Sequence, residues 1–162
     1  MRSLIIAAGA LALCTGPLVV SAARAAPADD IAATINQFIA AFDKGDIKGA
    51  AATHDTANLT IIDEVAPYVW KGPKAFDGWL HDLTSGDAKA GISGESVAIS
   101  PPSRVEVDGD NAYAVAPAVY SFKDHGAAMH EPAQMTFALH KGAVGWKITA
   151  WTWTGPKPTP AS

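Results

Sequence analysis

Apolar residues in the first half of the chain recur at helical spacing. Before residue 43 they occupy every third or fourth position, at Ile31, Ile35, Phe38, Ile39 and Phe42. Asp29 or Asp30 precedes this stripe and Lys44-Gly45 follows it, and these residue types are typical of a helix start and a helix end. The pattern predicts one amphipathic helix that buries a single face.

Two further helices are predicted before residue 93. Asp46 is a candidate N-cap for a short alanine-rich helix from Ile47 to about Thr53. Gly72-Pro73 precedes a third helix, whose apolar stripe is Phe76, Trp79, Leu80 and Leu83. Between these two helices, Leu59-Thr-Ile-Ile62 is rich in β-branched residues and predicts the first strand.

From Ser93 onward the pattern changes to strands. Asp108-Gly-Asp-Asn111 is a typical hairpin sequence between two alternating runs. Pro117 lies within a long run, which predicts an edge position or a bulge. The last two runs each place apolar residues on one face, at Met135, Phe137, Leu139, Trp146 and Ile148. Helices followed by short antiparallel connections predict an α+β fold, in which one curved sheet packs on helices.

Two tryptophans near the end break this alternation. Trp151 and Trp153 have the opposite parity from Trp146, so they lie on the outer face unless a bulge intervenes. An outer tryptophan face needs cover, and a second copy of the chain is the simplest cover. The alternative is that they close an inner pocket together with Trp70, Trp79 and Tyr120.

The N-terminal sequence is typical of a secretory signal peptide. Arg2 precedes an uncharged apolar run, and Ala23-Arg24-Ala25 fits the cleavage rule. The run of about 17 residues is interrupted by Gly16-Pro17, which disfavours a membrane-spanning helix. We therefore expect a periplasmic or secreted protein composed of a signal peptide at 1–25, one domain at 26–154 and a flexible proline-rich tail at 155–162.

Charge and cysteine content exclude several classes of protein. The chain has 12 basic and 16 acidic residues, and removal of Arg2 and Arg24 makes it more acidic than its net charge of −4. No basic patch is present, which excludes a nucleic-acid surface. The single cysteine, Cys14, lies in the signal peptide, so we expect no disulfide or thiol chemistry in the mature chain. Cys14 could also be a lipid-attachment site, but such a site has a small residue before the cysteine, and Leu13 does not fit. We therefore expect no membrane attachment after cleavage.

The order of these segments resembles the SnoaL-like branch of the nuclear transport factor 2-like (NTF2-like, ketosteroid isomerase-like) superfamily. The resemblance covers essentially the whole mature chain and rests on Lys44-Gly45-Asp46, Leu59-Thr-Ile-Ile-Asp63, Gly72-Pro-Lys-Ala-Phe76, Asp108-Gly-Asp-Asn-Ala112 and Trp146-Lys-Ile148. It implies a cone-shaped, curved antiparallel sheet wrapped around three N-terminal helices, with a hydrophobic pocket at the wide end and often a homodimer. It implies no single reaction, because this superfamily contains isomerases, dehydratases, cyclases, hydrolases and non-catalytic binders.

Asp63 is the first candidate catalytic residue. It shares strand parity with Leu59 and Ile61, which predicts a position at the inner mouth of the cup. An acid beside apolar walls suits a general base that moves a proton next to a carbonyl. Its position is similar to that of the catalytic acid in ketosteroid isomerases, although Phe38 and Phe42 stand where that family has an oxyanion-binding tyrosine. The alternative is an aspartate that only starts the following turn.

Glu131 is a second acidic candidate. It shares parity with Met135, so it is predicted to point inward. Asp63 and Glu131 would then form a carboxylate pair or meet a cationic ligand. If Pro132 distorts the strand, Glu131 faces solvent instead, which is the usual place for an unpaired acid.

The five histidines form no metal-binding motif, and we expect neither a metal nor a cofactor. His54 and His81 are candidate pocket residues, with helix-end and surface roles as the alternatives.

Taken together, these features of the sequence predict an exported protein that binds a small apolar molecule in a cup. A cofactor-independent isomerase or dehydratase and a dimerisation module are the alternatives. The predicted ligand contacts are Trp70, Trp79, Tyr120 and Glu131.

Overall fold

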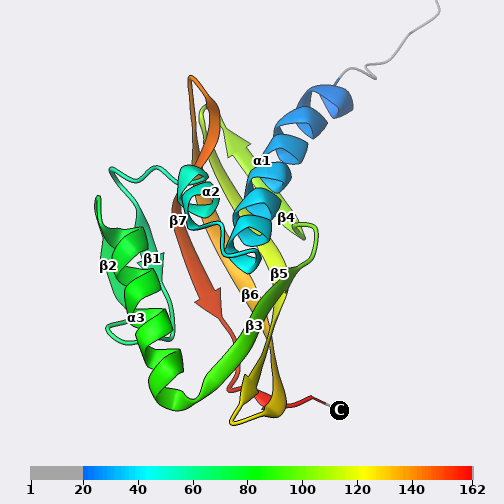
Figure 1. Ribbon diagram of the computed structural model, residues 1–162. Helices are drawn as coiled ribbons and strands as arrows, with labels where there is room; N and C mark the ends of the chain where they lie inside the picture. Colours follow the sequence, from blue (N-terminus) through cyan, green and yellow to red (C-terminus); the bar gives the residue numbers. More distant parts are fainter. Residues whose placement is uncertain (1–19, 162) are drawn as a thin grey trace, which may run out of the picture.

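The computed structural model describes residues 20–161 (Figure 1). Its helices are α1 (Val20–Asp43), α2 (Ile47–Ala52) and α3 (Ala75–Ala90). Its strands are β1 (Thr60–Ile62), β2 (Val69–Lys71), β3 (Ile92–Ile99), β4 (Arg104–Asp108), β5 (Asn111–Asp124), β6 (Ala127–Gly142), β7 (Gly145–Thr154) and β8 (Thr159–Pro160). The expected signal peptide falls mostly on residues 1–19, outside the described residues. Among residues 20–161, no helix combines the length and the hydropathy needed to span a membrane.

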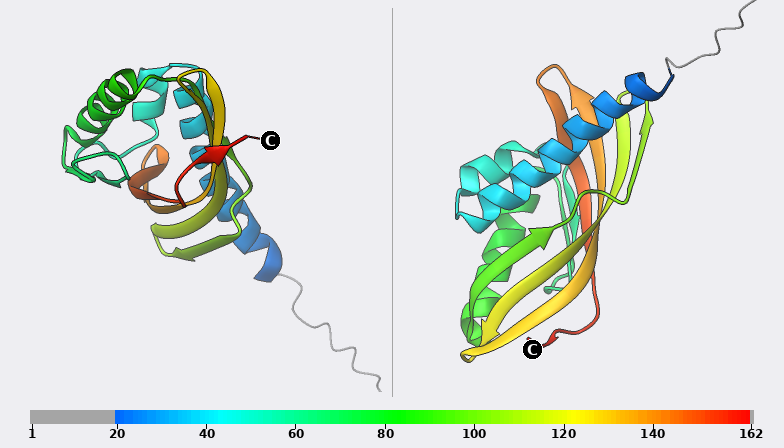
Figure 2. Two further views of the ribbon diagram at one scale, coloured as in Figure 1. Left: turned by 90° about the horizontal axis from the view of Figure 1, so that it is seen from below. Right: turned by 90° about the vertical axis from the view of Figure 1, so that its right-hand side faces the viewer.

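All strands belong to one sheet in the order β2-β1-β7-β6-β5-β3, with β4 beside β5 and β8 beside β6. The neighbours are antiparallel except for β1 and β7, which are parallel, so the sheet is mixed where a purely antiparallel one was expected. Figure 2 shows the helices on one side of the sheet and the sheet curving around them. The predicted cone-shaped α+β fold is confirmed.

The core lies between the helices and the concave face of the sheet. Ile31 and Phe38 of α1 are almost completely buried, as the helical stripe predicts. Phe137 and Leu139 of β6 and Ile148 of β7 meet them with the predicted strand alternation. Burial of side chains of this size contributes about 1.5–3 kcal/mol each, so this shared face holds the helices on the sheet.

The local signals at the helix ends are confirmed at one junction and wrong at another. Asp46 caps α2 as predicted, since its Oδ1 accepts a hydrogen bond from the Gly49 N–H at 2.9 Å. Gly45 before it has φ +69°, a conformation that favours glycine. The cap predicted at Asp29 or Asp30 is wrong, because the helical backbone of α1 continues back to Val20.

A bulge in β7 decides which face the late tryptophans occupy. The β6–β7 register shifts between Ala138 and Leu139, and Thr149 is the additional residue in β7. The Thr149 hydroxyl donates a hydrogen bond to the Ala138 carbonyl at 3.1 Å. A one-residue bulge inverts the alternation that follows it. Trp151 therefore lies on the inner face and is only 2% exposed, so the outer tryptophan face is wrong. The alternative agrees with the structure, since Trp151 and Trp153 line an inner pocket with Trp79 and Tyr120.

Pro117 occupies a gap between two partners of β5 rather than an edge or a bulge. The pairing with β3 ends at Ala118, and the pairing with β4 begins at Val115. The Pro117 carbonyl accepts a hydrogen bond from the Ser100 N–H at 2.9 Å in this gap. The missing proline N–H therefore interrupts no ladder, which explains why a long strand tolerates this residue.

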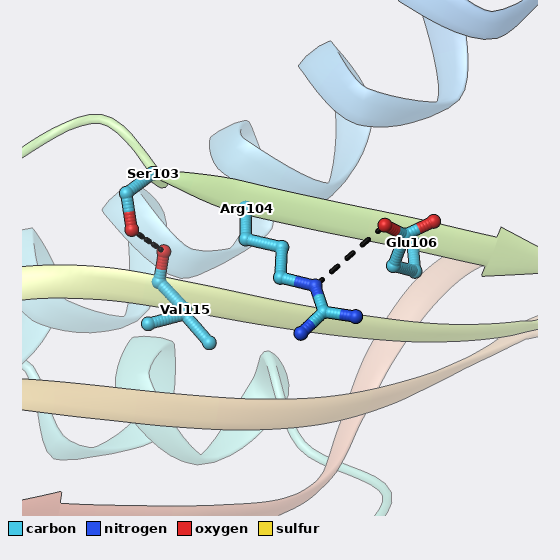
Figure 3. Close-up of polar contacts among 4 residues, drawn as sticks. All are labelled: Ser103, Arg104, Glu106 and Val115. Carbon is cyan, nitrogen blue, oxygen red and sulfur yellow. Dashed lines mark hydrogen bonds and ion pairs between the residues drawn. The ribbon is translucent and has the colours of Figure 1, made fainter.

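Figure 3 shows the polar contacts at the start of β4, on the outside of the sheet. The Ser103 hydroxyl donates to the Val115 carbonyl at 3.3 Å, and Arg104 Nε lies 3.6 Å from Glu106 Oε1. Both charged side chains are exposed. A surface ion pair of this kind contributes about 0–1 kcal/mol, so the Arg104–Glu106 pair adds little to the fold's stability.

The C-terminal segment is paired with the sheet, which differs from the flexible tail expected at 155–162. Strand β8 pairs with Met129 and His130 of β6. The Ala161 N–H also donates to the Ala128 carbonyl at 2.9 Å. This pairing brings Lys157 and Pro158 to the cavity described below.

Candidate functional site: an aromatic and acidic cavity

A cavity of about 700 Å³ lies between the helices and the concave face of the sheet. Most of its wall is apolar and much of it is aromatic, with rings from Phe38, Phe42, Trp79, Tyr120, Trp151 and Trp153. The volume is within the range of about 300–1,000 Å³ that is usual for small-molecule sites. The predicted apolar cup is therefore present as a space of ligand size.

Neighbouring rings hold each other in position around this cavity. Trp79 meets Trp151 edge to face at 4.9 Å between centroids, and Phe42 lies 5.4 Å from Trp79. On the sheet, Tyr120 of β5 meets Trp153 of β7 edge to face at 6.2 Å. Such pairs contribute about 0.5–1.5 kcal/mol beyond their burial, so the aromatic wall is preorganised.

Asp63 follows β1 directly and lines the cavity, at the position that strand parity predicts. Its Oδ2 accepts a hydrogen bond from Trp79 Nε1 at 2.6 Å, and its Oδ1 accepts one from the Glu64 N–H at 2.6 Å. Burial raises the pKa of Asp63, while these hydrogen bonds to the ionised form oppose the rise. The result is a carboxyl group of fixed orientation whose charged form is disfavoured.

Glu131 is completely buried, and the alternative that it faces solvent is wrong. Its Oε1 accepts a hydrogen bond from Trp153 Nε1 at 2.7 Å. Its Oε2 has no hydrogen-bond partner within the described part of the chain. Glu131 was predicted as a ligand contact, but it is not among the residues that line the cavity. It lies against Glu64, which does line the cavity.

Glu64 is a cavity residue that the sequence reasoning missed. Burial of its carboxyl group, together with the hydrogen bond and the negative charge of Glu131, raises the pKa of Glu64 to about 7. Asp63 adds a smaller repulsion. The only available signal was its position next to Asp63, since the contact with Glu131 links residues that are far apart in the chain.

A second pair of acids, Asp87 of α3 and Glu95 of β3, was also missed and lines the same cavity. Burial first, then the charges of Glu95 and Asp63, raises the pKa of Asp87 to about 6. The pKa of Tyr120 is raised well above its ordinary value by burial and by acids that include both of these residues. The charges of these acids therefore act on the Tyr120 hydroxyl and favour its protonated form.

Two of the predicted pocket residues lie elsewhere. Trp70 is buried, and its Nε1 donates a hydrogen bond to Asp82 Oδ2 at 2.9 Å, away from the cavity lining. His81 is exposed on α3 and is not a lining residue either. Neither side chain is placed to contact a molecule in the cavity.

His54 is a core residue rather than a cavity residue. It is 5% exposed, its Nδ1 lies 3.0 Å from the Ala50 carbonyl oxygen, and its ring meets Phe38 edge to face at 4.7 Å. Burial, assisted by the charge of Lys147, lowers the pKa of His54 to about 4 against the opposing Ala50 hydrogen bond. The imidazole is therefore neutral at neutral pH.

Across residues 20–161, no group of three or more potential ligands is placed to hold a metal ion.

The fold and the cavity together define a cone-shaped α+β domain with a ligand-sized interior. The family described as "SnoaL-like domain" matches residues 31–152, and the chain belongs to this family. Domains with this fold commonly contain a ligand-binding pocket, and they include isomerase and dehydratase enzymes. No curated protein sequence matches the chain significantly.

Solved structures show the same architecture at low sequence identity. An NTF2-like superfamily protein from Salmonella enterica serovar Typhimurium is 19% identical, with a TM-score of 0.68 over 86% of this chain and 97% of that chain. The hexachlorocyclohexane dehydrochlorinase LinA-type3 from Novosphingobium barchaimii is 14% identical, with a TM-score of 0.71 over 86% and 92%. A ketosteroid isomerase-like protein from Erwinia carotovora is 17% identical, with a TM-score of 0.60 over 78% and 93%. At these identities the likeness establishes the fold alone.

Proposed function

We propose that this chain, after export, binds a small and largely apolar molecule in the cavity between its helices and its sheet. The supporting observation is the cavity of about 700 Å³ lined by rings from both the helices and the sheet. Transfer of apolar ligand surface from water into such a space contributes roughly 25 cal/mol per Å². Because the rings already hold one another in place, little ordering of the wall opposes binding.

Removal of the expected signal peptide is compatible with this role. Cleavage after Ala25 shortens α1 at its N-terminal end, whereas the α1 residues that line the cavity begin at Phe38. The binding site therefore lies entirely within the mature chain.

Filling the cavity tests this proposal. Leu83→Trp on α3 places a larger side chain against the space and is expected to weaken binding of the neutral fluorescent probe N-phenyl-1-naphthylamine at least tenfold. Probe fluorescence in a titration measures the affinity. Ala88→Trp is the matched control, because it adds the same side chain to an exposed position of the same helix outside the lining. Equal affinities of the two variants would argue against this cavity as the binding site.

A second function is favoured by the state of Asp63. Its carboxyl group lines the cavity, has a raised pKa and is held by the Trp79 indole. In this orientation Asp63 would act as a general base toward a proton next to a carbonyl group. The hydroxyl of Tyr120, also at the cavity, stays protonated and would donate to the developing oxyanion.

Deuterium exchange tests this catalytic role. The native chain is expected to accelerate exchange of the α-protons of 2-tetralone in D₂O, and Asp63→Asn is expected to reduce the acceleration about 100-fold or more. Proton NMR follows the exchange, and retained binding of N-phenyl-1-naphthylamine shows that the variant keeps its cavity. An exchange rate that Asp63→Asn leaves unchanged would remove the catalytic role and leave binding as the function.

A further inference from the structure

We infer that the ligand of this cavity is an apolar organic cation, in which an ammonium nitrogen meets the carboxylates while the apolar body packs on the rings. This inference rests on the proposed function, since it assigns a charge to the molecule bound at the same site.

The first observation is the imbalance of charge around the cavity. Five carboxyl groups line it, from Asp43, Asp63, Glu64, Asp87 and Glu95. Among the described lining residues only Lys157 carries the opposite charge. In the described part of the chain, none of the five carboxylates forms a salt bridge. The protein itself therefore leaves this negative charge largely uncompensated.

The second observation is the unpaired oxygen of Glu131. This carboxyl group is completely buried, and its Oε2 has no hydrogen-bond partner in the described residues. The group lies against Glu64, which lines the cavity and can donate a hydrogen bond to Glu131 only when its own carboxyl group is protonated. Once Glu64 is ionised, neither carboxylate has a proton to share with the other. A buried polar atom without a partner is unfavourable by about 1–3 kcal/mol, and more for a charged group. A cation at the cavity side of Glu64 would offset the negative charge of both residues.

The third observation is the connection between the acids and the aromatic rings. Trp79 donates its indole N–H to Asp63, and Trp153 donates its indole N–H to Glu131. Each carboxylate is thus fixed beside a ring of the cavity wall. A cation over an aromatic ring is stabilised by about 0.5–2 kcal/mol of interaction free energy. Carboxylates next to the ring stabilise the same cation further, because they carry the opposite charge.

These observations separate three kinds of ligand. An anion would add to the repulsion among the carboxylates. A neutral apolar molecule would pack on the rings, but it would displace water from the carboxylates without offering them a new polar partner, which is unfavourable. An apolar cation packs on the aromatic rings and also pairs with the carboxylates. Of the three kinds of ligand, it is the only one that the negative charge of the cavity attracts.

The ionisation of the acids makes the inference dependent on pH. The titratable groups at the cavity are Asp43 on α1, Asp63 and Glu64 after β1, Asp87 on α3, Glu95 on β3, Tyr120 on β5 and Lys157 on the C-terminal segment, with Glu131 of β6 behind Glu64. With a pKa of about 7 for Glu64 and about 6 for Asp87, both groups gain protons as the pH falls from 8 to 5. A bound cation favours the ionised forms, so its affinity is expected to rise with pH across this window.

A pair of isosteric probes tests the charge directly. Benzyltrimethylammonium and neopentylbenzene have the same shape, and only the first is charged. Displacement of N-phenyl-1-naphthylamine at pH 8 is expected to show at least tenfold tighter binding of the cation. Between pH 8 and pH 5 the cation is expected to lose about fivefold or more in affinity, while neopentylbenzene is unchanged. Equal affinities, or tighter binding of neopentylbenzene, would overturn the inference and leave the proposed function intact. If neither compound nor the fluorescent probe binds, the proposed function fails as well.

Two charge-removing variants locate the effect. Glu95→Gln and Glu131→Gln keep the side-chain shape and are each expected to weaken the cation about fivefold while leaving neopentylbenzene unchanged. Asp110→Asn, in the exposed β4–β5 turn, is the matched control and is expected to change neither affinity. A loss that is the same in all three variants would show a general effect of net charge and would contradict a cation site in the cavity.

Discussion

Replacing Trp151 with alanine is expected to lower the free energy of unfolding by about 3–5 kcal/mol. The bulge at Thr149 turns this side chain inward, where it is 2% exposed. It packs 4.9 Å from Trp79 and 5.9 Å from Phe38, measured between ring centroids, so it joins the sheet to both α3 and α1. Urea denaturation at pH 7, followed by far-ultraviolet circular dichroism, measures the change.

The matched control for this prediction is Tyr113→Ala. Tyr113 is an aromatic residue of the same sheet, but it is 41% exposed. Its replacement is expected to change the free energy of unfolding by no more than about 1 kcal/mol. If both variants lose the same small amount, Trp151 does not occupy the inner face, and the bulge would have to be placed elsewhere.

Acidification is expected to remove the stability that neutral His54 provides. Its pKa is about 4 in the folded chain, against 6.5 for an unburied histidine. The unfolded chain therefore binds a proton first, so the contribution is complete above pH 6.5 and is lost as the pH falls toward 4. A difference of this size corresponds to roughly 3 kcal/mol. The free energy of unfolding of the native chain, relative to His54→Leu, is thus expected to fall by about 3 kcal/mol between pH 7 and pH 4.

The comparison of two chains is essential to this experiment. The raised pKa values of Asp63, Glu64 and Asp87 act in the opposite direction, because protonation of these carboxyl groups favours the folded chain as the pH falls. Both chains contain these acids, so the difference between them isolates His54. Urea denaturation at half-unit pH intervals supplies the values, and parallel curves for the two chains would contradict a buried neutral imidazole.

Local periodicity was sufficient for most of the fold. The stripe that includes Ile31 and Phe38 predicted the buried face of α1, and the alternation of Phe137 and Leu139 predicted the inner face of β6. Both patterns repeat with the geometry of a single element, so they can be read without knowledge of its neighbours. The same parity also predicted that Glu131 points inward.

The exceptions arose where one element is defined by another. The parity of β7 changes at Thr149 because of its pairing with β6, and no pattern within β7 marks that position. The start of α1 also differed from the prediction, but for a local reason. Aspartate is a good N-cap residue and is also tolerated within a helix, so Asp29 and Asp30 did not mark the start. Strand β2 is only three residues long, too short for a periodic signal.

The sequence by itself determined the fold class, the family and the inward position of Asp63. The fold class and the family follow from the order of segments along the chain, and the position of Asp63 follows from the alternation within one strand. Only the tertiary structure decided the composition of the cavity. It joined Glu64 with Glu131 and Asp87 with Glu95, and it moved Trp151 from the outer face to the inner one. The physical reason is that charge repulsion and burial depend on distances in space, and strand pairing and helix packing set those distances.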